Sequence, residues 1–168
     1  DIKDIEFDKK KVKWIATSLG LSTFDGTNWD AFDISNSRIP GNLVMTLAID
    51  NNNFKWIGTG NGLAKLKDTS WTIYHAAVPG LPDEIVNSVA VDSKNVLWIG
   101  TASGVAVMDG NKWTMMDSSN SKIAGLNTRC IAIEKNGTKW IGLSRGLAKY
   151  DGKNWTIYNS TNSNLPDN

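Results

Sequence analysis

Hydrophobic and polar residues alternate along this chain in short runs, a pattern typical of β-strands rather than helices. Between residues 44 and 74, clusters rich in Asn, Asp and Gly separate the runs and predict tight turns. We expect four strands in this stretch, at Val44–Ile49, Phe54–Thr59, Leu63–Leu66 and Trp71–Tyr74. No long run has the 3.6-residue period of an amphipathic helix, so the pattern predicts an all-β protein.

The same pattern returns every 42 residues. Two series of tryptophans mark the period: Trp14, Trp56, Trp98 and Trp140, and Trp29, Trp71, Trp113 and Trp155. Four such units account for all 168 residues. Four strands in a unit of this length make a propeller blade, whereas a parallel β-helix has shorter coils without two-residue hairpin turns. We therefore predict a β-propeller of four-stranded antiparallel blades, four blades per chain. It would form a single domain, 1–168, with blades at about 1–42, 43–84, 85–126 and 127–168.

Repetition also predicts how blades pack. Side chains alternate between the two faces of a strand, so Trp56 and Gly58 share a face, and the missing side chain lets a neighbouring sheet approach closely. Because all eight tryptophans occupy fixed positions in the repeat, we expect most of this aromatic area in the core, with at most one series partly exposed.

Composition disfavours several classes of function. The chain has 18 basic and 17 acidic residues, a net charge of +1, and its single basic run, Lys9–Lys11, falls in a predicted turn. We therefore expect no nucleic-acid binding, which requires a concentrated basic face. No stretch approaches the roughly 18 apolar residues of a membrane span, so no membrane insertion is expected. The single cysteine, Cys130, excludes an internal disulfide and is expected to be buried.

Catalytic chemistry is sparse in this sequence. One histidine, His75, and one cysteine exclude the usual zinc sites, and no cofactor is implied. Four carboxylates recur at the end of the first strand of each unit, where an acid accepts backbone N–H groups of a turn: Asp8, Asp50, Asp92 and Glu134. A catalytic carboxylate pair is expected to be an asymmetric feature instead. We therefore predict that the protein is not an enzyme.

Function in a repeat protein is expected where the copies differ. The starts of the first strands differ, as do the turns between second and third strands and the segments that join blades. In propellers these regions surround one mouth of the central channel, which is the usual ligand site. The candidate ligand-binding residues are Arg129, Arg145, Asn87, Lys3, Arg38 and His75.

The final unit contains a long and specific sequence motif. Its segments are Lys139–Gly142, Gly146–Gly152, Asn154–Tyr158 and Leu165–Asn168. The motif resembles the two-component regulator propeller repeat, and the other units carry it with substitutions. The resemblance implies the extracytoplasmic sensor part of bacterial hybrid histidine kinases, and hence a periplasmic or extracellular location. Such proteins commonly have seven blades to a ring, whereas this chain has four and no kinase.

The leading functional expectation is a non-catalytic recognition module that binds a ligand such as a glycan, or a protein, at the channel mouth. The alternative is a structural or assembly unit without a small-molecule ligand, as half of a larger ring or as an excised or engineered array. A propeller lyase or hydrolase is less favoured, because the chain has a single histidine.

Ring closure leaves three arrangements open. Units and blades are in phase, so no overhanging strand is expected to complete the last blade. The chain could close alone, pair with a second copy as an eight-bladed ring with twofold symmetry, or form part of a larger propeller. Unpaired blade faces would expose large apolar patches, and we favour self-association into the eight-bladed ring over the closed monomer.

Overall fold

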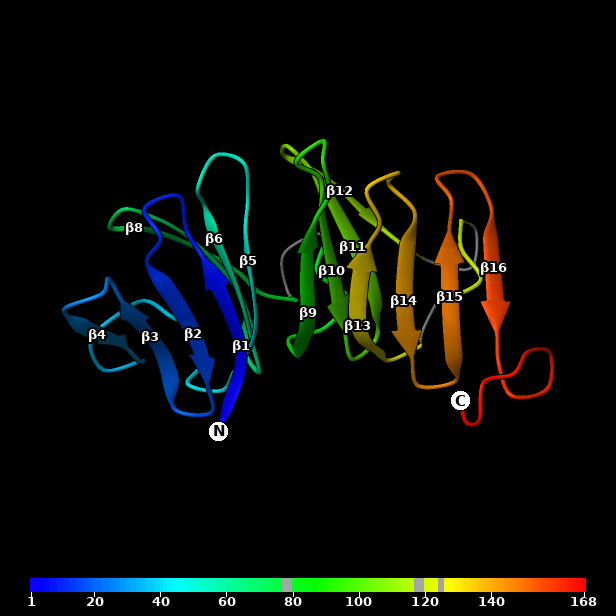
Figure 1. Ribbon diagram of the computed structural model, residues 1–168, viewed down its shortest axis with the longest axis horizontal. Coiled ribbons are helices and arrows are strands. Elements are labelled where there is room, and N and C mark those ends of the chain that lie inside the picture. Colours follow the sequence, from blue (N-terminus) through cyan, green and yellow to red (C-terminus); the bar gives the residue numbers. More distant parts are fainter. Residues whose placement is uncertain (77–79, 117–119, 124–125) are drawn as a thin grey trace.

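The computed structural model describes residues 1–76, 80–116, 120–123 and 126–168. Its strands form four separate four-stranded antiparallel sheets, which confirms the predicted all-β propeller fold (Figure 1).

Blade 1 consists of β1 (Ile2–Phe7), β2 (Lys13–Thr17), β3 (Gly20–Phe24) and β4 (Trp29–Phe32). Blade 2 consists of β5 (Val44–Ile49), β6 (Lys55–Thr59), β7 (Gly62–Lys67) and β8 (Ser70–Tyr74). Blade 3 consists of β9 (Val86–Val91), β10 (Leu97–Thr101), β11 (Gly104–Asp109) and β12 (Lys112–Met115). Blade 4 consists of β13 (Thr128–Ile133), β14 (Lys139–Leu143), β15 (Gly146–Tyr150) and β16 (Trp155–Tyr158).

Strands pair in chain order within each blade, so every sheet is built from hairpins alone. The turn between the second and third strands depends on glycine, as Gly62 of blade 2 illustrates. Gly62 has a φ of +122°, and a Cβ atom there would lie 2.6 Å from the carbonyl oxygen of Tyr74. A side chain at this position would therefore be strained and would clash with the fourth strand.

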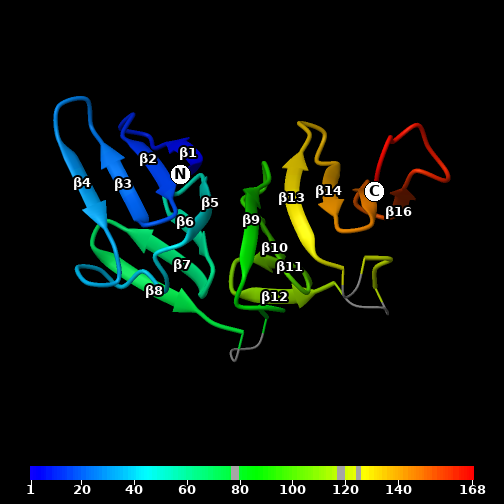
Figure 2. The same cartoon turned by 90° about the horizontal axis from the view of Figure 1, so that it is seen from below.

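The four blades lie in an open arc (Figure 2). The inner strands β1, β5, β9 and β13 line the concave side, and blades 1 and 4 occupy the two ends. The inner strand of each blade contacts the inner strand of the next. The structure is therefore an open array and differs from a four-bladed ring closed on itself.

A hydrophobic cluster fills each interface between consecutive blades. We call the face of a blade that packs on the next blade its trailing face, and the opposite face its leading face. At the interface of blades 2 and 3, Trp56 and Leu63 come from the trailing face, and Val89 and Ile99 from the leading face. Equivalent clusters lie between blades 1 and 2 and between blades 3 and 4. The first tryptophan series therefore lies on trailing faces, and Trp14, Trp56 and Trp98 are buried there.

Gly58 shows why the tryptophan strand needs a residue without a side chain. A Cβ atom at Gly58 would lie 2.7 Å from Cγ1 of Val86 in the next blade and 2.5 Å from Cγ2 of Thr46 in its own blade. The close approach of a neighbouring sheet, predicted from the Trp-Ile-Gly pattern, is present in the structure.

The recurrent acids stabilise turns in three of the four blades, as predicted. In blade 1, Oδ1 of Asp8 accepts hydrogen bonds from the backbone N–H groups of Lys10 and Val12. Asp50 and Asp92 accept the equivalent pairs. Glu134 differs because its longer side chain accepts the indole N–H of Trp140 instead.

The prediction of a buried thiol at Cys130 is wrong, because this cysteine is exposed. Cys130 lies on β13, on the trailing side of blade 4. Blade 4 is at one end of the arc, and none of the other three described blades covers this position. The apolar pattern around the residue correctly indicated a strand but could not indicate what packs against it.

Candidate functional site

The inner strands begin at one end of the concave channel, and their first residues surround a hollow of about 360 Å³. Four lining residues hold equivalent positions in the four blades: Lys3, Met45, Asn87 and Arg129. Leu43, just before β5, completes the lining. We call this hollow the channel mouth. It combines two cationic side chains, one amide and two apolar side chains.

Three of the six predicted ligand-binding residues thus come together at the channel mouth. Lys3 is exposed, and its Nζ atom lies 3.4 Å from a carboxylate oxygen of Asp1. Asn87 is half-buried, and its amide donates hydrogen bonds to Oδ1 of Asn127 (3.2 Å) and to the carbonyl oxygen of Thr128 (2.8 Å). Because these acceptors belong to the start of blade 4, Asn87 also ties two blades together. Arg129 is exposed.

The other three predicted residues lie outside the lining of the mouth. Arg145 is exposed in the turn between β14 and β15, and this turn is bonded to the start of β13 through Ser144 N–H and the carbonyl of Asn127 (2.8 Å). Arg38 is exposed in the segment that joins blades 1 and 2. His75 follows β8, and its Nδ1 atom lies 3.2 Å from Oε2 of Glu84 in a largely exposed pair.

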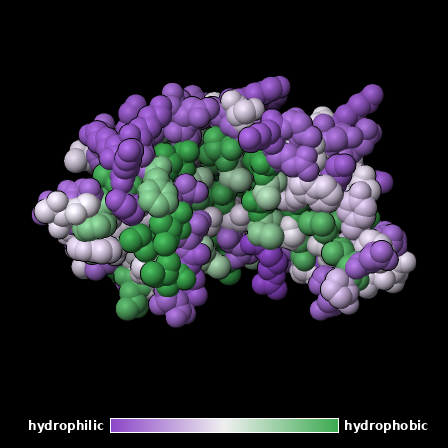
Figure 3. All heavy atoms as spheres, viewed as in Figure 1, coloured by the Kyte–Doolittle hydropathy of each residue, from purple (hydrophilic) through white to green (hydrophobic). Residues whose placement is uncertain are grey.

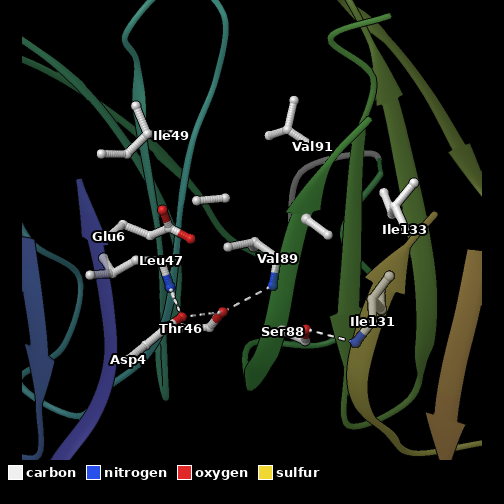
Figure 4. Close-up of a pocket in the computed structure, with 12 residues that line it drawn as sticks. Asp4, Glu6, Thr46, Leu47, Ile49, Ser88, Val89, Val91, Ile131 and Ile133 are labelled. Carbon is white, nitrogen blue, oxygen red and sulfur yellow. Dashed lines mark hydrogen bonds between the residues drawn. The ribbon is translucent and has the colours of Figure 1, made fainter. Parts of the chain in front are cut away.

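A second hollow, of about 390 Å³, lies further along the channel (Figure 4). Its walls come from the four inner strands. The lining residues are Asp4, Glu6, Thr46, Leu47, Ala48, Ile49, Ser88, Val89, Ala90, Val91, Ile131 and Ile133. One wall carries both carboxylates, and most of the other side chains are aliphatic. The channel is therefore acidic on the side of blade 1 and apolar elsewhere.

A ladder of hydrogen bonds joins the inner strands across the floor of this hollow (Figure 4). Oδ2 of Asp4 accepts the backbone N–H of Leu47 at 2.8 Å. Oγ1 of Thr46 accepts the N–H of Val89 at 3.1 Å. Oγ of Ser88 accepts the N–H of Ile131 at 3.0 Å. Each small polar side chain therefore satisfies a backbone donor of the following blade.

Sequence reasoning missed both carboxylates of this hollow, Asp4 and Glu6. Burial raises the pKa of the Glu6 carboxyl, and the neighbouring Asp4 carboxylate raises it further. The signal was present in the repeat, because the equivalent positions hold Ala48, Ala90 and Ala132. A single acid in a series of alanines is a departure from the repeat that is visible in the sequence.

Among the described residues there is no group of three or more His, Cys, Asp or Glu side chains placed to hold a metal ion. In the same part of the chain, no helix has the length and apolar character required to cross a membrane.

Comparison with known proteins supports the resemblance found in the repeat. Residues 80–103 match the family model described as the two component regulator propeller. These residues include β9, β10 and the segment leading into them. No curated protein sequence matches the chain significantly.

Several solved structures share the fold. The extracellular domain of the hybrid two component system BT3049 from B. thetaiotaomicron matches with a TM-score of 0.85 and 24% identity, over 99% of this chain and 24% of that one. The corresponding domain of BT4673 matches with a TM-score of 0.80 and 21% identity, over 100% and 24%. Virginiamycin B lyase from Staphylococcus aureus matches with a TM-score of 0.74 and 13% identity, over 94% and 55%.

At these identities the likeness establishes the fold, and the chain spans about a quarter of the length of the two-component neighbours. The chain is accordingly a propeller array of four blades that carries the two component regulator propeller signature at residues 80–103.

Proposed function

We propose that the chain is a non-catalytic recognition module that binds an anionic ligand, such as an acidic glycan, at the channel mouth. One observation carries the proposal: the same repeat position in four blades supplies Lys3, Met45, Asn87 and Arg129 to one hollow. A repeat that needed these residues only for its fold would keep them alike. Here they differ in charge, size and polarity.

The chemistry of the mouth suits such a ligand. The ammonium of Lys3 and the guanidinium of Arg129 provide charge-assisted donors for a carboxylate or sulfate group. Met45 and Leu43 provide apolar surface for the carbon-bound face of a sugar ring or for an aliphatic side chain. Arg145 and Arg38, in loops outside the lining, would add positive charge for a longer ligand. A protein with an acidic segment is the alternative ligand of the same chemistry.

A sensory setting agrees with this role. The two-component neighbours are extracellular domains, and we propose that this chain also acts outside the cytoplasm. Catalysis is less favoured although more distant neighbours include lyases. The single histidine, His75, pairs with Glu84 in a largely exposed contact within a segment that joins two blades.

A glycan array that contains neutral, uronic-acid and sulfated oligosaccharides would identify ligands, and titration calorimetry would measure their affinity. We expect acidic glycans to bind and Lys3→Ala or Arg129→Ala to weaken binding about tenfold or more, since a hydrogen bond to a charged group contributes about 1.5–3 kcal/mol. Lys10→Ala is the matched control, because Lys10 is an exposed cation in the turn after β1, at the other end of the channel. Equal affinity in all three variants would reject the mouth as the site.

A further inference from the structure

The two ends of the arc carry blade faces that every internal interface buries. On the leading face of blade 1, Ile5 is 46% exposed, whereas its equivalent in blade 2, Leu47, is 3% exposed. On the trailing face of blade 4, Trp140 is only half-buried, whereas Trp56 is 3% exposed. Figure 3 looks onto the open side of the arc and shows hydrophobic atoms gathered over β1. Exposed apolar patches of this kind mark interaction surfaces.

A hollow of about 420 Å³ lies on the uncovered trailing face of blade 4. Trp140, Leu147, Tyr158, Asn164 and Leu165 contribute to its lining. In the preceding blades, the place of this hollow is filled by the next blade. Leu165 is only partly buried, whereas its equivalents in the other blades, Ile39, Leu81 and Ile123, are buried.

The internal interfaces show which side chain belongs in such a hollow. At the interface of blades 2 and 3, the ring of Trp113 lies 5.4 Å from that of Tyr74, measured between centroids, and Trp113 also packs over Gly80. At the interface of blades 1 and 2, Trp71 lies 6.1 Å from Phe32 in the same way. The second tryptophan series therefore enters the trailing face of the preceding blade.

Trp29 is the member of this series whose blade stands at the open end of the described arc. It is 63% exposed and stacks on Phe24 of its own blade, with ring centroids 4.6 Å apart. We infer that the trailing face of blade 4 binds the leading face of blade 1 of a second copy. Trp29 of the second copy fills the hollow beside Tyr158, which holds the position of Tyr74 in the repeat.

Charge complementarity supports the same pairing. Lys55 of blade 2 lies 3.2 Å from Asp8 of blade 1, and Lys139 of blade 4 lies 3.1 Å from Asp92 of blade 3. Both ion pairs cross a blade interface and are buried. At the junction between two copies, the same positions hold Lys13 and Glu134. The pairing therefore places Lys13 opposite Glu134, in the positions that the Lys55–Asp8 and Lys139–Asp92 ion pairs hold at two internal interfaces.

Both copies carry both faces, so two identical junctions form when a pair closes into an eight-bladed ring with twofold symmetry. The channel mouth is then lined by eight strand starts instead of four. The association depends on the end faces, so it is tested separately from ligand binding at the channel mouth.

Analytical ultracentrifugation over a range of concentrations tests the inference. The expected result is a dissociating species of twice the 18.4 kDa chain mass. A single species of 18.4 kDa at all concentrations would overturn it, and would indicate that other blades or another protein cover the faces. A series of growing open oligomers would overturn the closed pair.

Exchange of the junction charges identifies the contact. Glu134→Lys places two lysines at each junction, and Lys13→Glu places two acids there, so each variant alone should weaken dimerisation by more than about tenfold. An equimolar mixture should restore dimers, because one junction then joins the two substituted side chains, again of opposite charge, and the other holds the native pair. Lys10→Glu is the control for a charge change away from the faces. Dimers in both single variants, or no recovery on mixing, would refute the junction.

Discussion

The ion pair between Lys55 and Asp8 predicts unequal effects when each partner is replaced. Their side chains are 8% and 5% exposed, so both charges lie out of water. Asp8 also accepts the N–H groups of Lys10 and Val12, at 2.8 and 3.0 Å. It keeps these two bonds when the lysine is removed. Lys55 has the ring of Trp14 at 4.9 Å as its other charge contact, which is a weaker partner for a buried ammonium group.

We expect Asp8→Asn to reduce the free energy of unfolding by about 3–5 kcal/mol, because it leaves a buried cation unpaired. Lys55→Leu should change the free energy of unfolding by only about 1 kcal/mol. A well-packed apolar side chain can replace a buried charge at little cost, provided that the partner, here the Asp8 carboxylate, keeps its other hydrogen bonds. Blade 3 already has leucine at this position, Leu97, which is 2% exposed. The indole N–H of Trp14 has no hydrogen-bond partner among the described residues, and it could then reach Asp8 as Trp56 reaches Asp50 at 3.2 Å.

Urea unfolding followed by tryptophan fluorescence at neutral pH would measure both variants. Protein concentration must be the same throughout, because self-association would add to apparent stability. The double variant Asp8→Asn with Lys55→Leu should recover much of the stability lost in Asp8→Asn. Equal losses in the two single variants, or no recovery in the double variant, would refute the assignment of the penalty to the unpaired lysine.

Three further outcomes are expected. Gly58→Ala should lower the free energy of unfolding in a urea titration by about 1–3 kcal/mol, because the added methyl group overpacks against the next blade. Gly60→Ala is the control and should have little effect, since a Cβ atom there would lie 3.6 Å from its nearest neighbour, Leu43. Glu6→Gln should increase the free energy of unfolding at pH 7, because the pKa of Glu6 is raised above its usual 4.5 and its ionisation therefore opposes folding. Urea titrations at several pH values should show that this gain over the unsubstituted protein disappears below pH 4.5, where Glu6 is protonated in both the folded and the unfolded state. Cys130→Ser should tighten dimerisation about two- to tenfold in sedimentation experiments. The serine hydroxyl would accept a backbone N–H from blade 1 of the second copy, as Ser88 accepts one from blade 4. Unchanged dimerisation would count against the junction.

Features that repeat were predictable from the sequence, and most of them depend on contacts within one blade. The strands, the turn at Gly62 and the turn-forming role of Asp8 and Asp50 follow from local backbone geometry. The burial of Trp56 against a neighbouring blade also followed, because its place beside Gly58 indicated a packed face.

Features that depend on which blade neighbours which were not predictable. Lys55 and Asp8 lie in different units, and neither residue is unusual within its own unit. The exposure of Cys130 depends on the open end of the arc rather than on its surrounding sequence. Glu6 was detectable as the single acid among alanines, yet its partly buried carboxyl beside Asp4 emerges only when the inner strands are brought together.

The strictly sequential strand order within each sheet also bears on how the chain folds. All ladder contacts join strands that are adjacent in sequence, and blade interfaces join segments about one repeat apart. The contacts therefore join parts of the chain no farther apart than neighbouring blades, which favours folding that starts in one blade and spreads to its neighbours. A chain shortened by removal of blade 4 should still fold, with the trailing face of blade 3 and Trp98 newly exposed to solvent.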